Sequence, residues 1–265
     1  MPELIDVNGL KVSAERPSQV VGPPLVLVHG LLGGAWYFEK YQRFFAERGH
    51  ASYAVNLRGH HGSRPVHDVA RVSIMDYVDD VLEVTRTLED PVLLGHSMGG
   101  LIAQKVGERD GLRGLVLLCA VPPRGIVLAG ATLFRKQLKH LPSLVFSRPL
   151  QGSLDDAVDL FFNLIPADER EALHANVVSG SARAARECSL GAIAVDERRI
   201  RCPVLVVGGT QDRFVPVYVA RRLAAKYSAQ YLEFADHAHF IVWEPGWERP
   251  ASAIAEWLAK LPVAA

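Results

Sequence analysis

The sequence has few cysteines, no excess of charge of either sign and no run of basic residues. Its three cysteines, Cys119, Cys188 and Cys202, are an odd number without a CxxC spacing, so we expect reduced structural thiols. Lysine plus arginine and aspartate plus glutamate each total 29, which leaves no net field to collect polyanions or membranes non-specifically. The sequence therefore predicts no nucleic-acid partner.

We also expect no targeting or membrane-spanning segment. The first residues, Met1 to Asp6, do not form a basic region followed by an apolar stretch. No run reaches the ~18 consecutive apolar residues that a membrane span needs. We therefore predict a cytoplasmic protein without stable membrane insertion, and the sequence leaves its oligomeric state open.

Apolar residues are numerous enough for a large core. Of the 265 residues, 49% are hydrophobic and 22% are charged, as is usual for globular proteins. Short apolar runs alternate with longer helical patterns, which favours a parallel sheet with helices on both faces. The predicted strands are 25–29, 51–56, 91–96, 112–120, 202–208 and 230–234. The predicted helices are 36–48, 74–88 with Ser73 and Asp76 at its start, 101–109, 217–227 and 250–261.

This alternation is interrupted between residues 122 and 199, where the sequence is helical without a clear strand. We interpret residues 122–199 as a helical cap over the ends of the strands, inserted into one core domain made of residues 1–121 and 200–265. Residues 124–148 are basic and residues 154–171 are acidic. Either these are solvated helix faces, or the two halves pair and help to orient substrate or open the cap.

The strongest local motif is the hexapeptide Gly95-His96-Ser97-Met98-Gly99-Gly100, between a predicted strand and a predicted helix. A nucleophilic serine has to project from a sharp strand-to-helix turn, and small residues two positions away on either side let the neighbouring backbone pass. The N–H of Met98 opens the helix, so it is expected to point at an oxyanion with help from the helix dipole. The alternative is that the glycines form only a tight turn.

With this motif the sequence resembles the α/β-hydrolase family, in its serine esterase and lipase-like branch. The resemblance also rests on residues 29–33, 57–60, 208–216 and 239–245, and it runs over most of the chain. It implies an α/β-hydrolase fold with a mostly parallel sheet of about eight strands and a cap after the sixth. It further implies that the His-Gly-Leu-Leu-Gly segment at 29–33 is an oxyanion loop, with the Leu31 N–H as a second donor.

The same resemblance implies an acid and a base for Ser97. The acid is Asp212, because the other position that some members use holds Cys119-Ala120-Val121 here and no carboxylate. Asp212 could otherwise be only a turn residue ahead of a helix. The base is His239 or His237. Family members commonly carry it five residues before a Glu-Pro pair, and Glu244-Pro245 favours His239.

Other histidines are interpreted as structural. His29 is expected to brace the oxyanion loop, since a triad needs only one base. His60 and His61 lie in a stretch that resembles the family's Asp-x-Arg-Gly-x-Gly, although it begins with Asn56 and has an extra histidine. We expect scaffolding there. If His237 is not the base, it lines the pocket or forms a hydrogen bond in its loop.

Together these assignments predict a carboxylic ester hydrolase that works through an acyl-enzyme on a small-molecule ester, without metal or organic cofactor. Dehalogenases and most epoxide hydrolases of the family carry Asp at the elbow, so Ser97 favours acyl chemistry. Apolar residues of the predicted cap suggest a small-to-medium apolar acyl or alcohol group; the alternative is that about half of them only pack the cap onto the core. They are Ile126, Val127, Leu128, Leu133, Phe134, Phe161 and Phe162.

Several related activities fit the same residues. Acyl transfer, thioester or lactone cleavage, perhydrolysis and hydrolytic carbon–carbon cleavage all use such a triad, and the sequence does not separate them. A non-catalytic ligand-binding protein with this fold is a further alternative, because fold alone does not prove turnover.

Overall fold

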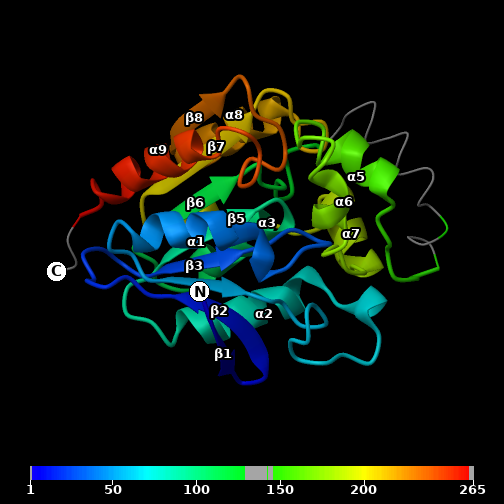
Figure 1. Cartoon of the computed structure of the whole chain (residues 1–265), viewed down its shortest axis with the longest axis horizontal. Coiled ribbons are helices and arrows are strands. Elements are labelled where there is room, and N and C mark those ends of the chain that lie inside the picture. The colour runs from blue at the N-terminus through cyan, green and yellow to red at the C-terminus, as the bar shows by residue number, and fades with distance from the viewer. Residues whose placement is uncertain (1, 129–141, 143–145, 263–265) are drawn as a thin grey trace.

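The computed structural model describes residues 2–128, 142 and 146–262, and these residues form an eight-stranded sheet. The strand order is β1-β2-β4-β3-β5-β6-β7-β8 (Figure 1). Only the pairs β1–β2 and β2–β4 of this sheet are antiparallel, so the predicted mostly parallel sheet is confirmed. The strands are β1 Glu3–Val7, β2 Leu10–Glu15, β3 Leu25–Val28, β4 Ser52–Val55, β5 Val92–His96, β6 Gly114–Leu118, β7 Val204–Gly209 and β8 Gln230–Phe234.

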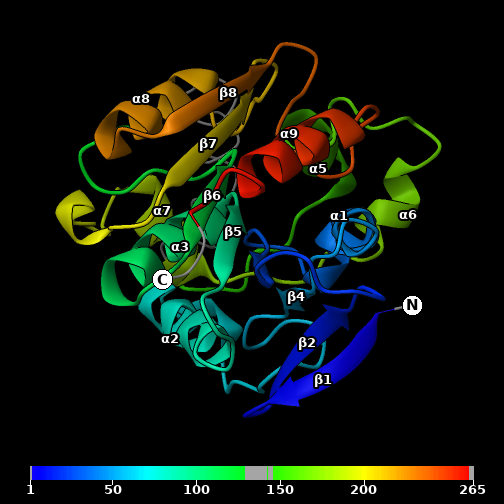
Figure 2. The same cartoon turned by 90° about the vertical axis from the view of Figure 1, so that its left-hand side faces the viewer.

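Helices cover both faces of this sheet, as the sequence predicts. The helices α1 and α9 pack on one face, and α2, α3 and α8 pack on the other (Figure 2). Their bounds are α1 Glu39–Ala46, α2 Ile74–Thr85, α3 Met98–Arg109, α8 Val217–Tyr227 and α9 Glu248–Leu258. Short 3₁₀ helices are η1 Ala35–Phe38, η2 Val69–Arg71 and η3 Glu197–Arg199.

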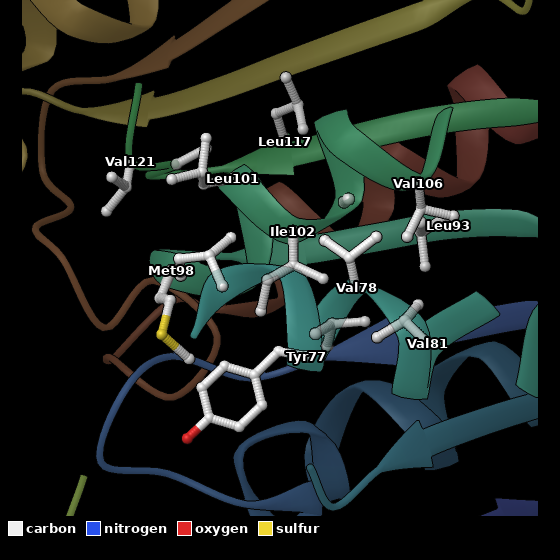
Figure 3. Close-up of a cluster of buried hydrophobic side chains, with 14 of the residues drawn as sticks. Tyr77, Val78, Val81, Leu93, Met98, Leu101, Ile102, Val106, Leu117 and Val121 are labelled. Carbon is white, nitrogen blue, oxygen red and sulfur yellow. The ribbon is translucent and has the colours of Figure 1, made fainter. Parts of the chain in front are cut away.

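Side chains of the inner strands alternate between two apolar clusters. In β5, Leu93 belongs to the cluster under α2 and α3, whereas Leu94 belongs to the cluster under α1 and α9. Figure 3 shows Tyr77 and Val78 of α2 and Ile102 of α3 in the same cluster as Leu93. Because both faces are covered, consecutive strand residues are apolar, and each buried side chain contributes ~1.5–3 kcal/mol. This packing fixes the carboxyl ends of the strands, where the predicted site lies.

Helical segments also fill the chain between β6 and β7. Among the residues described there, the helices are α5 Leu154–Leu160, α6 Arg170–His174 and α7 Ala182–Ser189, and pairing of strand type is limited to one bridge between Leu150 and Gly180. A helical insertion after the sixth strand is therefore confirmed, whereas its limits at residues 122 and 199 remain a prediction. Much of the basic stretch 124–148 lies outside the described residues, so its pairing with the acidic stretch also remains a prediction.

The start of α2 connects the insertion to the core. Ser73 Oγ accepts a hydrogen bond from the Asp76 N–H, and Asp76 Oδ2 accepts one from the Ser73 N–H. The predicted start of this helix at Ser73 and Asp76 is therefore confirmed, and the two residues form a capping box. Glu187 of α7 adds a third contact, because its Oε2 accepts the Ile74 N–H at 2.7 Å. The insertion is thus anchored on the first turn of α2.

The three cysteines are free thiols, with Cys119 and Cys188 buried and Cys202 half-buried. No helix within the described ranges has both the length and the apolar composition for crossing a bilayer.

Candidate active site

Ser97 stands on the turn between β5 and α3 in a strained backbone conformation. Its φ is 57° and its ψ is −122°, a combination that non-glycine residues rarely adopt and that clusters at functional sites. The turn is so tight that a Cβ on Gly95 would lie 2.2 Å from the Gly99 oxygen, and a Cβ on Gly99 would lie 2.1 Å from the Val28 oxygen. The predicted need for small residues on both sides of Ser97 is therefore confirmed.

His239 reaches Ser97 from the loop that follows β8. Its Nε2 lies 3.0 Å from Ser97 Oγ, and its Nδ1 lies 2.8 Å from Asp212 Oδ2. When Nδ1 carries the ring proton and donates it to Asp212, the lone pair of Nε2 faces the serine hydroxyl. The structure thus brings together, in buried positions, the three residues that the sequence predicts as nucleophile, base and acid.

Asp212 lies in the loop after β7, where both of its carboxylate oxygens are engaged. Oδ1 accepts the backbone N–H groups of Phe214 and Val215 at 2.8 Å each, while Oδ2 faces His239. The turn role that the sequence offered as an alternative is therefore present together with the contact to His239. Since the two backbone donors fix the carboxylate, the imidazole is held in one orientation.

Cys119 lies close to Asp212 and His239, and the spacing of these three side chains resembles that of metal ligands. One ligand atom each from Cys119, Asp212 and His239 lies within 4.8 Å of the others. However, burial, with the charges of Asp212 and Glu244, raises the pKa of the Cys119 thiol well above its usual value and disfavours the thiolate that a metal needs. Asp212 and His239 are also bonded to each other, so these side chains fit a hydrogen-bonded network better than a metal.

His237, the other candidate base, contributes to the loop that carries His239. Its Nδ1 lies 3.3 Å from Glu244 Oε2, and the same oxygen accepts the Ala238 N–H at 2.8 Å. Of the two histidines, His239 is the one within hydrogen-bond reach of Ser97. In the sequence, Glu244 served only to choose between the two histidines. In the structure it is fully buried and holds the backbone next to His239 through the Ala238 N–H.

His96 is a site residue that sequence reasoning missed. It donates from Nε2 to the backbone carbonyl of His239 at 2.7 Å, and the two rings lie 4.9 Å apart. Burial, together with the neighbouring His239, lowers the pKa of His96 to about 3, so the ring is neutral. The motif places His96 directly before Ser97, but its partner is 143 residues away and only the folded chain identifies it.

The loop after β3 passes directly beside Ser97, since a Cβ on Gly30 would lie 3.1 Å from the Ser97 Cβ. His29 is buried behind this loop, donates from Nδ1 to the Gly30 carbonyl at 2.7 Å and accepts the Leu57 N–H at Nε2. Burial lowers the pKa of His29 well below its usual value, so the ring stays neutral. This is the bracing role that the sequence predicts for His29.

Two backbone donors are available near the serine. Met98 is the first residue of α3, so its N–H has no acceptor within the helix. In the described part of the chain, the Leu31 N–H likewise donates to no backbone or side-chain acceptor. The Met98 side chain fills the core between α2 and α3, as Figure 3 shows, and leaves its N–H at the elbow. Such an arrangement can accept a developing oxyanion.

A pocket opens beside Ser97 and His239 and is bounded by residues of α5 and α7. The rings of Phe161 and Phe214 lie 5.5 and 5.0 Å from the ring of His239 and flank the base. Most of the lining is apolar, which suits a ligand with an apolar group. The lining includes Leu31, Leu128, Leu160, Phe161, Phe162, Ala185 and Phe214.

The apolar residues predicted to meet a substrate divide into three groups. Leu128, Phe161 and Phe162 line the pocket. Ile126 packs on the core, which is the alternative role that the sequence leaves open for these residues, and Val127 is exposed, so a substrate contact is not found for it. Leu133 and Phe134 lie outside the described residues.

Comparisons with known proteins show which family and fold the chain shares. The model of the alpha/beta hydrolase family matches residues 25–257. A non-heme chloroperoxidase, CPO-A1, from Kitasatospora aureofaciens is 28% identical over 85% of this chain and 88% of its own length. A carbendazim hydrolyzing esterase from Nocardioides sp. (strain SG-4G) is 28% identical over 84% of this chain and 88% of its own length. The esterase RhEst1 from Rhodococcus sp. ECU1013 shares the fold, with a TM-score of 0.74, 23% identity and 98% of each chain covered.

Proposed function

Since this chain belongs to the alpha/beta hydrolase family, we propose that it is a serine hydrolase of carboxylic esters with Ser97, His239 and Asp212 as its triad. The observation that carries the proposal is the continuous contact from Ser97 Oγ through His239 to Asp212, at 3.0 and 2.8 Å. The relatives named as esterases favour ester cleavage among the reactions that such a triad performs.

Nucleophilic attack begins with proton transfer from Ser97 to His239 Nε2. The serine oxygen then attacks the ester carbonyl, and the resulting oxyanion accepts hydrogen bonds from the Met98 and Leu31 N–H groups. Asp212 stabilises the imidazolium and holds the ring in place. His239 next gives its proton to the leaving alcohol, and the alcohol departs as the acyl-enzyme forms.

Deacylation uses the same groups in reverse. His239 takes a proton from water, the hydroxide attacks the acyl carbonyl, and the proton is returned to the Ser97 oxygen as the acid leaves. The apolar lining of the pocket favours an ester with a small-to-medium apolar acyl or alcohol group.

The first test is hydrolysis of p-nitrophenyl esters of increasing acyl length by the wild type and by Ser97→Ala. We expect the wild type to hydrolyse several esters and Ser97→Ala to lose on the order of 10⁶ in kcat. Ser252→Ala, on α9 away from the elbow, is the matched control and should keep full activity. An organophosphonate should add to Ser97 alone, as seen by mass spectrometry of the digested protein. A wild type that neither hydrolyses any ester nor reacts with the phosphonate would contradict the proposal.

A second comparison tests the choice of base. His239→Ala should abolish turnover, whereas His237→Ala should leave a measurable kcat because His237 contacts Glu244. If only His237→Ala is inactive, the assignment of His239 is wrong.

A further inference from the structure

His60 holds the oxyanion loop at a second point, one residue beyond the contact made by His29. It lies in the loop after β4, is fully buried, and its Nε2 lies 3.0 Å from the Leu31 carbonyl oxygen. His29 Nδ1 holds the carbonyl of the preceding residue, Gly30, at 2.7 Å. Two imidazoles therefore contact the two carbonyls on either side of the Leu31 Cα.

These contacts determine where the Leu31 N–H points. A trans peptide group is planar, so its N–H and its C=O point in opposite directions. His29 holds the Gly30 carbonyl, and the Leu31 N–H in the same peptide group is directed away from His29. His60 holds the next peptide group through the Leu31 carbonyl. Because a residue has only two soft backbone dihedrals, fixing both flanking peptide groups fixes Leu31.

The His60 ring is itself held firmly. It lies 5.0 Å from the ring of His29 and 5.8 Å from the ring of Tyr77. Both of its nitrogens face carbonyl oxygens at 3.0 Å, Nδ1 that of Arg58 and Nε2 that of Leu31, and a ring with one proton donates to only one of them, so the tautomer that holds the loop carries its proton on Nε2. The Arg58 side chain forms an ion pair with the buried Asp80 of α2 at 2.7 Å. The Leu31 carbonyl is thus connected, through the His60 ring and its contact with Tyr77, to α2, and the ion pair of Arg58 with Asp80 ties the loop that carries His60 to the same helix.

We propose that His60 is a positioning residue of the oxyanion hole, which aims the Leu31 N–H at the oxyanion by holding the Leu31 carbonyl. The inference rests on the proposed function, because it assumes that Ser97 forms a tetrahedral intermediate. A donor aimed beforehand stabilises the transition state without reorganisation, whereas a loop free to rotate its peptide groups presents the donor only part of the time. The contribution therefore belongs to kcat rather than to ground-state binding.

Asparagine and glutamine distinguish this role from simple filling of space. The amide nitrogen of glutamine lies near the position of imidazole Nε2, and that of asparagine near Nδ1. At position 60 the required donor is Nε2, so His60→Gln should keep kcat within about threefold, while His60→Asn should lose ~10–100-fold in kcat with KM nearly unchanged. At position 29 the required donor is Nδ1, so His29→Asn should be more active than His29→Gln.

This reversed order shows that a specific ring nitrogen acts as a donor, because a side chain that only fills space would rank the two amides alike at both positions. Unfolding in urea gives the stability of each variant, and if His60→Asn does not fold, His60→Gln still has to keep kcat within about threefold. An alkylboronic acid supplies a second readout, since its tetrahedral adduct on Ser97 places an oxygen in the oxyanion position. Its inhibition constant should rise in His60→Asn by about the same factor as kcat falls.

Several outcomes would overturn the inference. Equal kcat values for His60→Gln and His60→Asn, a loss confined to KM, or a boronic acid affinity unchanged by His60→Asn would each do so. If the wild type hydrolyses no ester but reacts with the phosphonate, only the assignment of a carboxylic ester as substrate is wrong. The relative rates at which the phosphonate labels the variants then test the role of His60. A wild type inert to both overturns the proposed function and this inference together.

Discussion

The carboxylate of Asp212 shows how much of this site depends on single buried contacts. Two backbone N–H groups hold one oxygen and His239 takes the other. Cys119, the residue after β6, lies close to the same carboxylate and to His239, within 4.8 Å between their ligand atoms, and its Sγ is 3.5 Å from the Ala238 carbonyl. Within this small space the acid could therefore be supplied from either of two strands.

We predict that the acid can be moved from β7 to β6. Asp212→Asn should lower kcat by ~10³–10⁴-fold, because the imidazolium loses its partner. Adding Cys119→Asp to this variant should recover ~10–100-fold, because a carboxylate at position 119 reaches the same region of the imidazole without the two backbone donors that hold Asp212. Steady-state kinetics on one ester would measure both.

The matched control for that rescue is the double variant Cys119→Asn with Asp212→Asn, because asparagine at position 119 has the size of aspartate without its charge. Equal activity of the two double variants would show that no carboxylate at position 119 serves His239.

His96 makes stability depend on pH through its buried neutral ring. Its pKa is about 3 in the folded chain against an ordinary 6.5, so between these values the unfolded chain binds a proton that the folded chain does not. The free energy of unfolding should therefore fall as pH falls below 6.5, by up to ~1.4 kcal/mol per pH unit from this residue. His29, with its pKa also lowered by burial, acts in the same direction.

We predict that His96→Gln, which keeps a donor for the His239 carbonyl, makes this pH dependence shallower. Urea unfolding between about pH 5 and pH 7 would measure the slope. His67→Gln is the control, because His67 is exposed and should leave the slope unchanged. A slope in His96→Gln as steep as in the wild type would mean that other groups cause the acid sensitivity.

The parts of the site that sequence reveals are those encoded by local spacing. Gly95, Ser97 and Gly99 are recognisable because a close approach within a few residues demands glycine at fixed positions. The partners of His60, which the sequence predicts only as scaffolding, and of His96 cannot be predicted, because they are backbone carbonyls 29 and 143 residues away. A carbonyl carries no side-chain signature, so no residue type at the far end indicates the contact.

At the scale of helices and strands, the best predictions concern elements covered on both sides. The inner strands β3 to β7 have continuous apolar runs, and α8 has the predicted bounds 217–227. The hairpin of β1 and β2 was not located, because it lies at the sheet edge and β1 is largely exposed, without an apolar run. α3 begins at Met98, as the elbow motif predicts, and thus three residues before the helical pattern at Leu101, since tertiary packing overrides the poor helix propensity of Gly99 and Gly100.

The contact between α7 and α2 carries a prediction at this scale. Glu187 accepts the N–H of Ile74, one of the unpaired donors in the first turn of α2, so removing it leaves that donor unsatisfied. Glu187→Ala should lower the free energy of unfolding by ~1 kcal/mol, and Glu187→Gln, which keeps an acceptor, by clearly less. Urea unfolding is the measurement. Glu256→Ala on the exposed side of α9 is the control. If it lowers the free energy of unfolding as much as Glu187→Ala does, the contact between Glu187 and α2 adds no specific stability.

On the scale of the whole molecule, the pocket is lined by two parts of the chain, the core and the insertion between β6 and β7. The core supplies Ser97 and His239 at the carboxyl ends of its strands, while α5 and α7 of the insertion supply Leu160 and Ala185. Sequence patterns indicate that both parts exist. They do not give the shape of the space between them, because that shape depends on how the insertion packs on the core.

Ala185 on α7 is a position where this shape can be changed without replacing a triad residue. It is half-buried and lines the pocket from the insertion, so Ala185→Phe adds an aromatic ring to the space for the substrate. Long acyl chains should then be excluded, with kcat/KM for an octanoate ester falling ~10–100-fold while that for an acetate ester changes less than about threefold. Ala172→Phe, at an exposed position of α6, should leave the whole chain-length profile unchanged. A uniform fall for all chain lengths in Ala185→Phe would instead mean that the ring disturbs the site itself, and that α7 does not set the length of the acyl chain.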